Sequence, residues 1–316
     1  MSDPLRSIRW SILDRSRTRD GEEPSQALRN TVAFAQQADE LGFHRFWVAE
    51  HHSVPGVAGS APTVLAAAVA AATSHVRVGT GGVMLPNHQP LIVAEQFGVL
   101  ASLHPDRIDM GLGRSVGFTG GVRRALGHDR EDAADFATQI HELLGYFSGE
   151  QDVHPGVHAW PAEGLRVPAF ILATGQGADL AAQLGLPLVI APARGEDAMV
   201  AAIERYREAF RPSAQEDEPY VIVSGTVAIA DTTEEARRML VPEAWAQCLL
   251  ADAWRVPAAH PRVAHRGAHH DRPAAPHLRR LHARPCPRHR RAGRGRTEPS
   301  PHAHARRRVP RPHEHL

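Results

Sequence analysis

Short runs of apolar residues alternate with longer stretches in which apolar residues recur every three or four positions, over residues 1–250. The short runs predict β-strands and the longer stretches predict amphipathic helices. In the first pair, the run IRWSIL at 8–13 is followed by Leu28, Val32 and Ala35 at helical spacing, until Gly42 ends the helix. The predicted strands are 8–13, 45–49, 76–85, 107–113, 169–173, 186–191 and 220–230, and the predicted helices are 24–42, 61–73, 91–103, 131–147, 177–184, 196–210 and 233–247.

This order of elements predicts the fold class. Seven successive strand–helix units with short connections favour a closed (β/α)8 barrel over an open, doubly wound sheet. No G-x-G-x-x-G motif follows the first strand, which argues against a Rossmann domain. An eighth strand and helix would have to follow residue 250, where the pattern stops. We therefore predict an α/β chain with a TIM barrel over residues 1–250 that is incomplete at its C-terminal end.

The composition changes abruptly near residue 250. Residues 1–250 hold 20 arginines and 31 acidic residues, whereas residues 251–316 hold 16 arginines, four acidic residues and no Ile, Met, Phe or Tyr. Without large apolar residues the 251–316 tail has no face to bury, so we expect it to be disordered. It has three interpretations: a basic tail for nucleic acid, a histidine-rich metal-binding tract, or a shifted reading frame in a GC-rich gene. The abruptness of the change favours the shifted frame, and nucleic-acid binding is not expected.

The remaining composition excludes several classes of protein. The chain is 42% hydrophobic and 22% charged, as soluble globular proteins are. No apolar run approaches the roughly 18–20 residues that span a bilayer. The first ten residues lack the apolar segment of a signal peptide. Two cysteines, Cys248 and Cys286, are too few for a disulfide framework. We expect a cytoplasmic protein that is not bound to a membrane.

Candidate chemistry lies where the predicted strands end, which is the edge at which barrel enzymes place their active sites. Each feature taken alone also has a purely structural interpretation, because loop histidines, strand glycines and surface arginines are common. Together they fit a pocket with proton-transfer groups, a flat wall and an anion site at a helix start. The proton-transfer candidates are Glu50, His51 and His52; the wall is Gly81 and Gly82; and the anion site is Arg114 with Thr174, Gly175, Gln176 and Gly177.

A metal-dependent hydrolase that uses His51 and His52 is a weaker alternative. Adjacent residues on a strand point to opposite faces, so both rings enter one pocket only if the loop bends. No further strand-end Asp or His ligands are visible. We expect no metal site.

Four segments in this order resemble the bacterial luciferase-like flavin monooxygenases, in the branch found in natural-product gene clusters. They are AEHH at 49–52, VRVGTGGVMLPNH at 76–88, DRIDMGLGRS at 106–115 and LGLP at 184–187. The resemblance covers about residues 5–245. It does not extend into the tail, where family members continue with an eighth strand and helices.

The resemblance implies a TIM barrel that binds reduced FMN supplied by a separate reductase. Dioxygen then forms a flavin C4a-hydroperoxide, which oxygenates a small organic substrate. A non-proline cis peptide would fall at Gly81–Gly82 under the flavin ring, and Arg114 and residues 174–177 would hold the phosphate. His51 is the first choice for acid–base chemistry. A homodimer through the second and third helices is a further implication.

Two alternatives to this function remain open. An F420-dependent oxidoreductase uses the same barrel and transfers hydride without oxygen. A degraded, non-catalytic flavin-binding protein would result if the barrel could not close. Oxygen consumption separates the first alternative from a monooxygenase.

Overall fold

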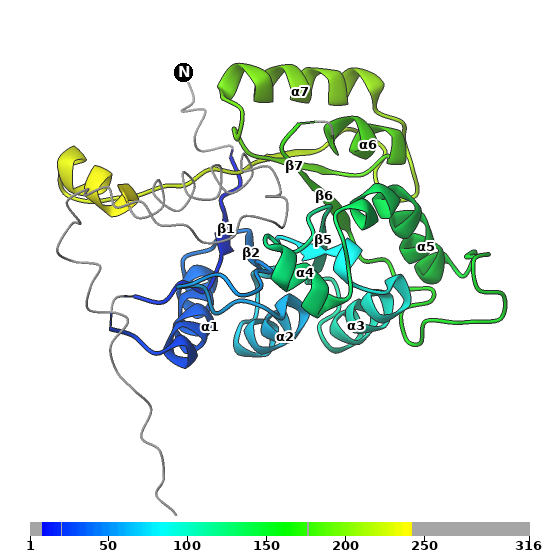
Figure 1. Cartoon of the computed structure of the whole chain (residues 1–316), viewed down its shortest axis with the longest axis horizontal. Helices are drawn as coiled ribbons and strands as arrows, with labels where there is room; N and C mark the ends of the chain where they lie inside the picture. Colours follow the sequence, from blue (N-terminus) through cyan, green and yellow to red (C-terminus); the bar gives the residue numbers. More distant parts are fainter. Residues whose placement is uncertain (1–7, 20, 176, 242–316) are drawn as a thin grey trace, which may run out of the picture. The chain divides into compact units, whose positions relative to one another are not determined.

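The structure is a computed structural model that describes residues 8–19, 21–175 and 177–241 (Figure 1). The described residues belong to one compact unit that ends at Val241. The expected tail at 251–316 and the domain boundary at 250 lie outside the described residues.

A single parallel sheet organises this unit. Its strands follow one another in the order β1-β2-β3-β5-β6-β7-β8, with β4 paired to β5 beyond the end of β3. The sheet curls as a TIM barrel does, with seven strand positions, and this confirms the predicted fold class. The strands are β1 (Ser11–Asp14), β2 (Arg45–Val48), β3 (Arg77–Thr80), β4 (Val83–Met84), β5 (Ile108–Gly113), β6 (Ala169–Ala173), β7 (Leu188–Ile190) and β8 (Val221–Val223).

The third predicted strand, 76–85, is divided into β3 and β4. A non-proline cis peptide joins Gly81 to Gly82 at the division, at the expected position. Both pieces pair with β5, through Val78 opposite Ile108 and through Val83 opposite Leu112. The last predicted strand, 220–230, is shorter than expected, because only β8 pairs with a neighbour.

Helices cover the outer face of the curled sheet (Figure 1). Prolines 24, 62 and 90 are the first residues of α1, α2 and α3, where the absence of an amide hydrogen costs nothing. The helices are α1 (Pro24–Glu40), α2 (Pro62–Ala72), α3 (Pro90–Leu103), α4 (Gly120–Leu126), α5 (Phe136–Ser148), α6 (Gly177–Leu184) and α7 (Glu196–Ala209), with 3-10 turns η2 (Leu85–Asn87) and η3 (Glu131–Asp135). The short helix α4 was not predicted from sequence, because its Gly-rich start lacks apolar periodicity.

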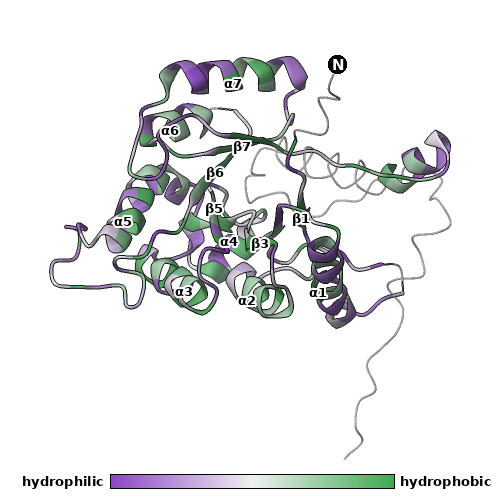
Figure 2. Cartoon of the chain, turned by 180° about the vertical axis from the view of Figure 1, so that it is seen from behind, coloured by the Kyte–Doolittle hydropathy of each residue, from purple (hydrophilic) through white to green (hydrophobic). Residues whose placement is uncertain are grey.

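Two apolar layers stabilise the unit. The larger layer lies between the sheet and the helices and includes Phe46 and Val48 of β2. The smaller layer lies inside the curl and consists of Trp47, Phe170 and Val189 with partly buried neighbours. Alternation along β2 therefore sends even-numbered residues outward and odd-numbered residues inward. Figure 2 shows that α1 and α7 carry both hydrophobic and hydrophilic residues, whereas α2 is largely hydrophobic.

An ionic cluster fills the inside of the curl near the start of the strands. Asp109 is fully buried and accepts hydrogen bonds from Arg45 Nε (3.0 Å), Trp47 Nε1 (3.1 Å) and Arg77 Nη2 (2.6 Å). The Arg45 guanidinium also lies 5.2 Å from the centre of the Phe170 ring. This cluster occupies the amino-terminal end of the interior.

The sheet has two edges within the described residues, because β1 and β8 do not pair with each other there. Apolar side chains at these edges are exposed, among them Trp10 at 56% and Val223 at 57%. An eighth unit would lie between these edges, and its place in the chain falls outside the described residues. In the described part of the chain, no helix combines the length and apolar character needed to cross a membrane.

Candidate functional site

A buried carboxylate lies at the carboxyl end of β2. Glu50 is 3% exposed, and its two oxygens accept hydrogen bonds from three donors. The donors are the Met84 backbone N–H (2.8 Å), His52 Nε2 (2.6 Å) and His88 Nε2 (2.9 Å). Glu50 therefore joins the end of β2 to Met84 of β4 and to His88 beyond it, 34 and 38 residues away in sequence.

These donors determine the charge of Glu50. Burial by itself raises the pKa of the carboxyl group, but the hydrogen bonds from His88, Met84 and His52 outweigh burial and leave the pKa below its ordinary value. Glu50 is therefore ionised at neutral pH. An ionised carboxylate only accepts hydrogen bonds, so the Nε2 atoms of both histidines carry hydrogen.

His51 has a different set of contacts from Glu50 and His52. Its ring stacks on Phe118, with the ring centres 6.0 Å apart and the planes 20° apart. Its Nδ1 atom is buried and has no hydrogen-bond partner among the described residues. Burial first, and then the positive charge of Arg15, lower the pKa of His51 to about 4. The imidazole is therefore neutral at physiological pH.

Glycines line part of the interior between β3 and β5. Gly79 and Gly111 lie where a Cβ atom would overlap the backbone of the neighbouring strand, at Asp109 and Thr80 respectively. Gly81 faces the interior between Leu13 and Trp47, and a Cβ there would overlap the end of the Leu13 side chain. A Cβ on Gly113 would lie no closer than 3.7 Å to a neighbouring atom. The result is a glycine wall, a strip of backbone without side chains along two adjacent strands, with Gly81 just beyond the carboxyl end of β3 and Gly113 at the carboxyl end of β5.

The expected anion site lies at the ends of β5 and β6. Arg114 directly follows β5, Thr174 directly follows β6, and both are exposed. Gly175 lies in the turn before α6, and Gly177 is the first residue of that helix, whose free N–H groups and dipole favour an anion. Gln176, the remaining residue of the expected site, lies outside the described residues. The strand order places the ends of β5 and β6 side by side.

A second arginine lies at this position and was not predicted from sequence. Arg194 follows β7 on the other side of β6, and a Cβ on Gly175 would lie 3.8 Å from Arg194 Nη1. Within the part of the chain that the structure describes, neither Arg114 nor Arg194 forms an ion pair. The only sequence signal was the position of Arg194 shortly after a predicted strand, which many surface arginines share.

The structure also includes His88 in the Glu50 cluster, although the sequence analysis did not select it. Its side chain is 32% exposed while Glu50 is fully covered, so it lies between solvent and the carboxylate. Asn87 next to it has an amide whose nitrogen and oxygen are both buried without a partner among the described residues. In the described residues, no three His, Cys, Asp or Glu side chains are arranged to hold a metal ion.

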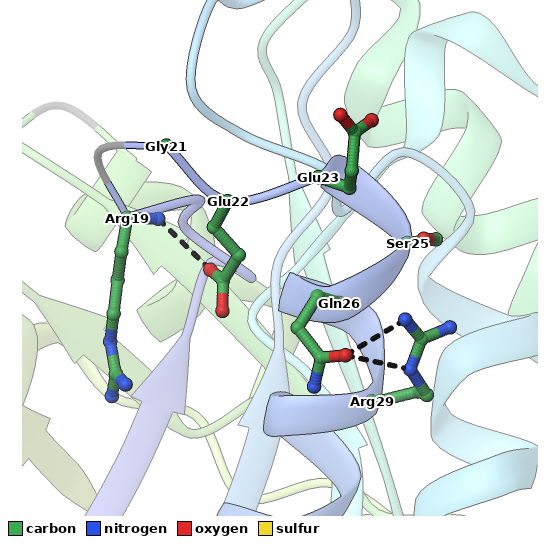
Figure 3. Close-up of a pocket in the computed structure, with 7 residues that line it drawn as sticks. All are labelled: Arg19, Gly21, Glu22, Glu23, Ser25, Gln26 and Arg29. Atoms are coloured by element: carbon green, nitrogen blue, oxygen red, sulfur yellow. Dashed lines mark hydrogen bonds between the residues drawn. The ribbon is translucent and has the colours of Figure 1, made fainter.

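A separate hollow lies on the loop between β1 and α1 (Figure 3). It is lined by Arg19, Gly21, Glu22, Glu23, Ser25, Gln26 and Arg29. Its polar groups bond to one another, as Arg19 N–H does to Glu22 and Arg29 does to Gln26. None of the strand-end residues described above lines it, so it is not part of the candidate site.

The candidate site has the features that a flavin mononucleotide requires. The glycine wall presents backbone rather than side chains to a flat ring, and His51 Nδ1, just beyond the end of β2, is a buried polar atom without a partner among the described residues. Two arginines and a helix start lie together at one side, as a phosphate needs. The residues of this chain therefore fit a reduced flavin.

Comparisons with known proteins agree with this description. The family model for luciferase-like monooxygenases matches residues 8–300. The uncharacterized protein YvbT of Bacillus subtilis (strain 168) is 44% identical over 230 residues, covering 72% of this chain and 68% of that protein. A luciferase-like monooxygenase of Escherichia coli (strain K12) is 39% identical, covering 73% and 69%. The N-acetyl-S-alkylcysteine monooxygenase of B. subtilis (strain 168) is 36% identical, covering 79% and 76%.

Solved structures show the same fold. The crystal structure of apo-MsnO8 superimposes with a TM-score of 0.68 at 32% identity, covering 80% of each chain. The oxygenating constituent of 3,6-diketocamphane monooxygenase from Pseudomonas putida, in complex with FMN, gives 0.63 at 19% identity, covering 78% of each chain. An F420-dependent secondary alcohol dehydrogenase gives 0.60 at 17% identity, covering 79% of this chain and 82% of that one. From this sequence, fold and strand-end geometry, the chain belongs to the luciferase-like monooxygenase family and is an oxidoreductase.

Proposed function

We propose that the protein is a monooxygenase that uses reduced FMN and dioxygen to oxygenate a small organic substrate. The observation that carries this proposal is the glycine wall, which has His51 on one side and Arg114 and Arg194 on the other. When bound, reduced FMN supplies the two electrons with which one oxygen atom of O2 enters the substrate and the other leaves as water.

In this proposal, His51 acts as a neutral imidazole that is partly shielded from water. Burial and Arg15 hold its pKa at about 4, so it exchanges hydrogen bonds with a bound group rather than delivering a positive charge. Stacking on Phe118 keeps water from one face of the ring. The unpaired Nδ1 atom is the point at which His51 can accept a proton or a hydrogen bond.

Glu50 has a positioning role beside His51. It holds the Nε2–H groups of His52 and His88, so both rings keep one tautomer and one orientation. Both histidines are partly exposed, and each can pass a proton between solvent and the end of the barrel.

The phosphate of the cofactor would lie between Arg114, Arg194 and the start of α6. Thr174, Gly175 and Gly177 supply a hydroxyl and backbone N–H groups there. An arginine paired with a phosphate contributes about 1.5–3 kcal/mol to binding. Removing either arginine should therefore weaken FMN binding roughly 10- to 150-fold.

The test is an anaerobic titration of the protein with photoreduced FMN, followed by admission of oxygen and measurement of oxygen uptake. Arg194→Ala and Arg114→Ala should raise the Kd, whereas Arg207→Ala, in an exposed position near the end of α7, should leave it unchanged. Saturable binding of reduced FMN followed by oxygen consumption is expected. Binding of reduced F420 without oxygen uptake would indicate the F420-dependent oxidoreductase instead. Flavin binding without oxidation of any substrate would indicate a non-catalytic protein.

We also propose that reduced FMN comes from a separate flavin reductase. The described residues include no G-x-G-x-x-G turn that could bind a nicotinamide cofactor. NADH alone should give no turnover with FMN, and adding a flavin reductase should restore it. Turnover with NADH in the absence of a reductase would contradict this part of the proposal.

A homodimer through α2 and α3 is the third part of the proposal. The outward stripes of these neighbouring helices are apolar, with Val64 at 70%, Val99 at 48% and Leu103 at 68% exposure. The two helices are tied together by a hydrogen bond from Thr63 to Gln96 (2.9 Å). Exposed apolar stripes on two adjacent helices are typical of surfaces that pack against a second subunit.

A further inference from the structure

One segment at the carboxyl end of the strands stands apart from both apolar layers. Residues 114–127 follow β5 and include the short helix α4. Among the described α-helices, α4 is the one without a buried residue. Its apolar residues Val122 and Leu126 are half-buried but belong to neither layer of the core. Figure 1 shows α4 beside β5, apart from the row that α1, α2 and α3 form.

The first residues of this segment cross the carboxyl end of the sheet. The segment begins at Arg114, after β5, and four residues later Phe118 stacks on His51, just beyond the end of β2. Because β3 lies between β2 and β5, the chain spans two strand spacings, or about 9.6 Å. Four extended residues reach roughly 13 Å, which is enough for this span. The segment therefore passes the carboxyl end of β3, where Gly81 belongs to the glycine wall.

The hydrogen bonds of this segment are internal. The Thr119 hydroxyl accepts from Val122 N–H (3.2 Å) at the start of α4, and Arg123 Nη1 donates to the Gly117 carbonyl (2.8 Å). Arg123 also pairs with Asp129 (3.7 Å), just past the helix. Among the described residues, no hydrogen bond joins α4 to another helix or to a strand. A segment with few buried apolar contacts and internal bonds can open at a small cost in free energy.

A glycine stands at each end of this segment. Gly127, at the end of α4, has a φ of +78°, a conformation that glycine adopts more readily than other residues. Gly113 directly precedes the segment, and a Cβ there would lie no closer than 3.7 Å to a neighbouring atom. Both ends therefore have room to change their backbone angles, as the hinges of a moving loop must.

The Phe118 side chain connects the segment to the site. It is half-buried, and its ring centre lies 6.0 Å from that of His51, with the planes 20° apart. Burial is the largest cause of the lowered pKa of His51, so the structure shows this ring covered. Movement of the segment away from β2 would uncover His51 and the carboxyl end of β3.

We propose that residues 114–127 form a lid over the flavin site, with Phe118 as the latch that rests on His51. The two glycines at its ends are the hinges. This inference rests on the proposed function and adds a conformational step to the same site. The first residue of the lid is also an expected phosphate ligand, so a bound phosphate fixes one end of the lid and the latch fixes the other. The closed lid excludes water from the reacting groups.

The first test is hydrogen–deuterium exchange of the full chain without flavin. We expect amides of residues 115–127 to exchange at least about tenfold faster than those of α3 and α5. Phe118→Ala should speed exchange in 115–127 by a further factor of about three or more and leave α3 and α5 unchanged. Trp160→Ala is the matched control, because Trp160 is exposed and stacks on His158 in a similar way (5.5 Å, 24°). It should leave 115–127 unchanged, and urea midpoints confirm that both variants are folded.

The second test is stopped-flow binding of FMN that has been photoreduced without air. Loss of a simple contact raises the dissociation rate constant alone, whereas loss of a latch raises the association rate constant as well. We expect Phe118→Ala to raise both rate constants about threefold or more, with a smaller change in Kd. Bound FMN should slow exchange in 115–127 about fivefold or more in the wild-type chain.

Three results would overturn the lid: exchange in 115–127 that is as slow as in α3, exchange that does not respond to Phe118→Ala, or exchange that bound FMN leaves unchanged. A rise in the dissociation rate constant alone would show that Phe118 is a contact and not a latch. The outcome is separable from that of the proposed function, because the first test contains no flavin. A chain that shows the Phe118→Ala response but does not bind FMN would disprove the cofactor and leave the lid standing.

Discussion

His51 is a histidine that folding keeps neutral. Its pKa is lowered to about 4 by burial and by Arg15, whereas an unfolded chain binds a proton at about 6.5. Between these values the unfolded state holds more protons than the folded state, so the free energy of unfolding decreases as the pH falls from about 6.5 toward 4. One such group contributes at most about 1.4 kcal/mol per pH unit.

The substitution His51→Phe tests this linkage. Phenylalanine keeps a flat ring against Phe118 but cannot take up a proton. We expect wild type and variant to differ little in their pH dependence above pH 7, and the wild type to lose more stability between pH 6.5 and 4.5. Urea unfolding at a series of pH values measures the difference, and parallel curves across that range would contradict the prediction.

Glu50 supports a second prediction at the residue scale. Glu50→Gln keeps the size of the side chain but places an amide NH2 group where one of three donors now bonds. A buried donor that faces another donor costs about 1–3 kcal/mol, so the urea midpoint should fall. Glu40→Gln, at an exposed position at the end of α1, is the control and should change stability little. An unchanged midpoint in Glu50→Gln would show that the carboxylate is not held as described.

At the scale of elements, strands β3 and β5 approach so closely that only glycine fits between them. A Cβ on Gly111 would overlap the Thr80 carbonyl, whereas a Cβ on Gly113, two residues further along the same strand, would meet nothing closer than 3.7 Å. Gly111→Ala should therefore destabilise the protein by about 1–3 kcal/mol, or prevent folding, because the strands must separate. Gly113→Ala should be close to wild type in stability.

The two alanine variants also distinguish an effect on folding from an effect on FMN binding. Gly113 lies at the end of β5, beside Arg114, so an added methyl group there should reduce FMN affinity while leaving the urea midpoint unchanged. Equal stability of the two alanine variants would mean that the close approach of β3 and β5 is not maintained in solution.

For the whole molecule, the expected association through α2 and α3 can be tested by a charge on the apolar stripe. Val99→Glu places a carboxylate in the middle of the stripe on α3, where Val99 is 48% exposed. It should convert a dimer to a monomer in light scattering, because burying an unpaired charge is costly. Val200→Glu on α7, at 49% exposure, is the matched control and should leave the dimer intact. A wild-type chain that is monomeric at micromolar concentration would contradict the proposed dimer.

The sequence by itself determined the order of strands and helices and the barrel that they form. Periodicity, prolines at helix starts and glycines after helices are local signals. The successive strand–helix units that they specify form a parallel sheet that curls as in a TIM barrel. The sequence also determined which residues stand at the carboxyl ends of the strands, because these are the residues that directly follow each predicted strand in the chain. It did not identify α4, whose Gly-rich start carries no period, and it extended the last predicted strand to 230 whereas β8 ends at Val223.

Only the tertiary structure decided how these residues meet. Glu50 bonds to His88, 38 residues away, and Arg194 lies beside Gly175, because neighbouring strands of a parallel sheet bring distant segments to one edge. The same packing divides His51 from His52, burying one against Phe118 and pairing the other with Glu50. Burial and the distances between charges are properties of the assembled sheet. They set the pKa of His51, and no local pattern in the sequence encodes them.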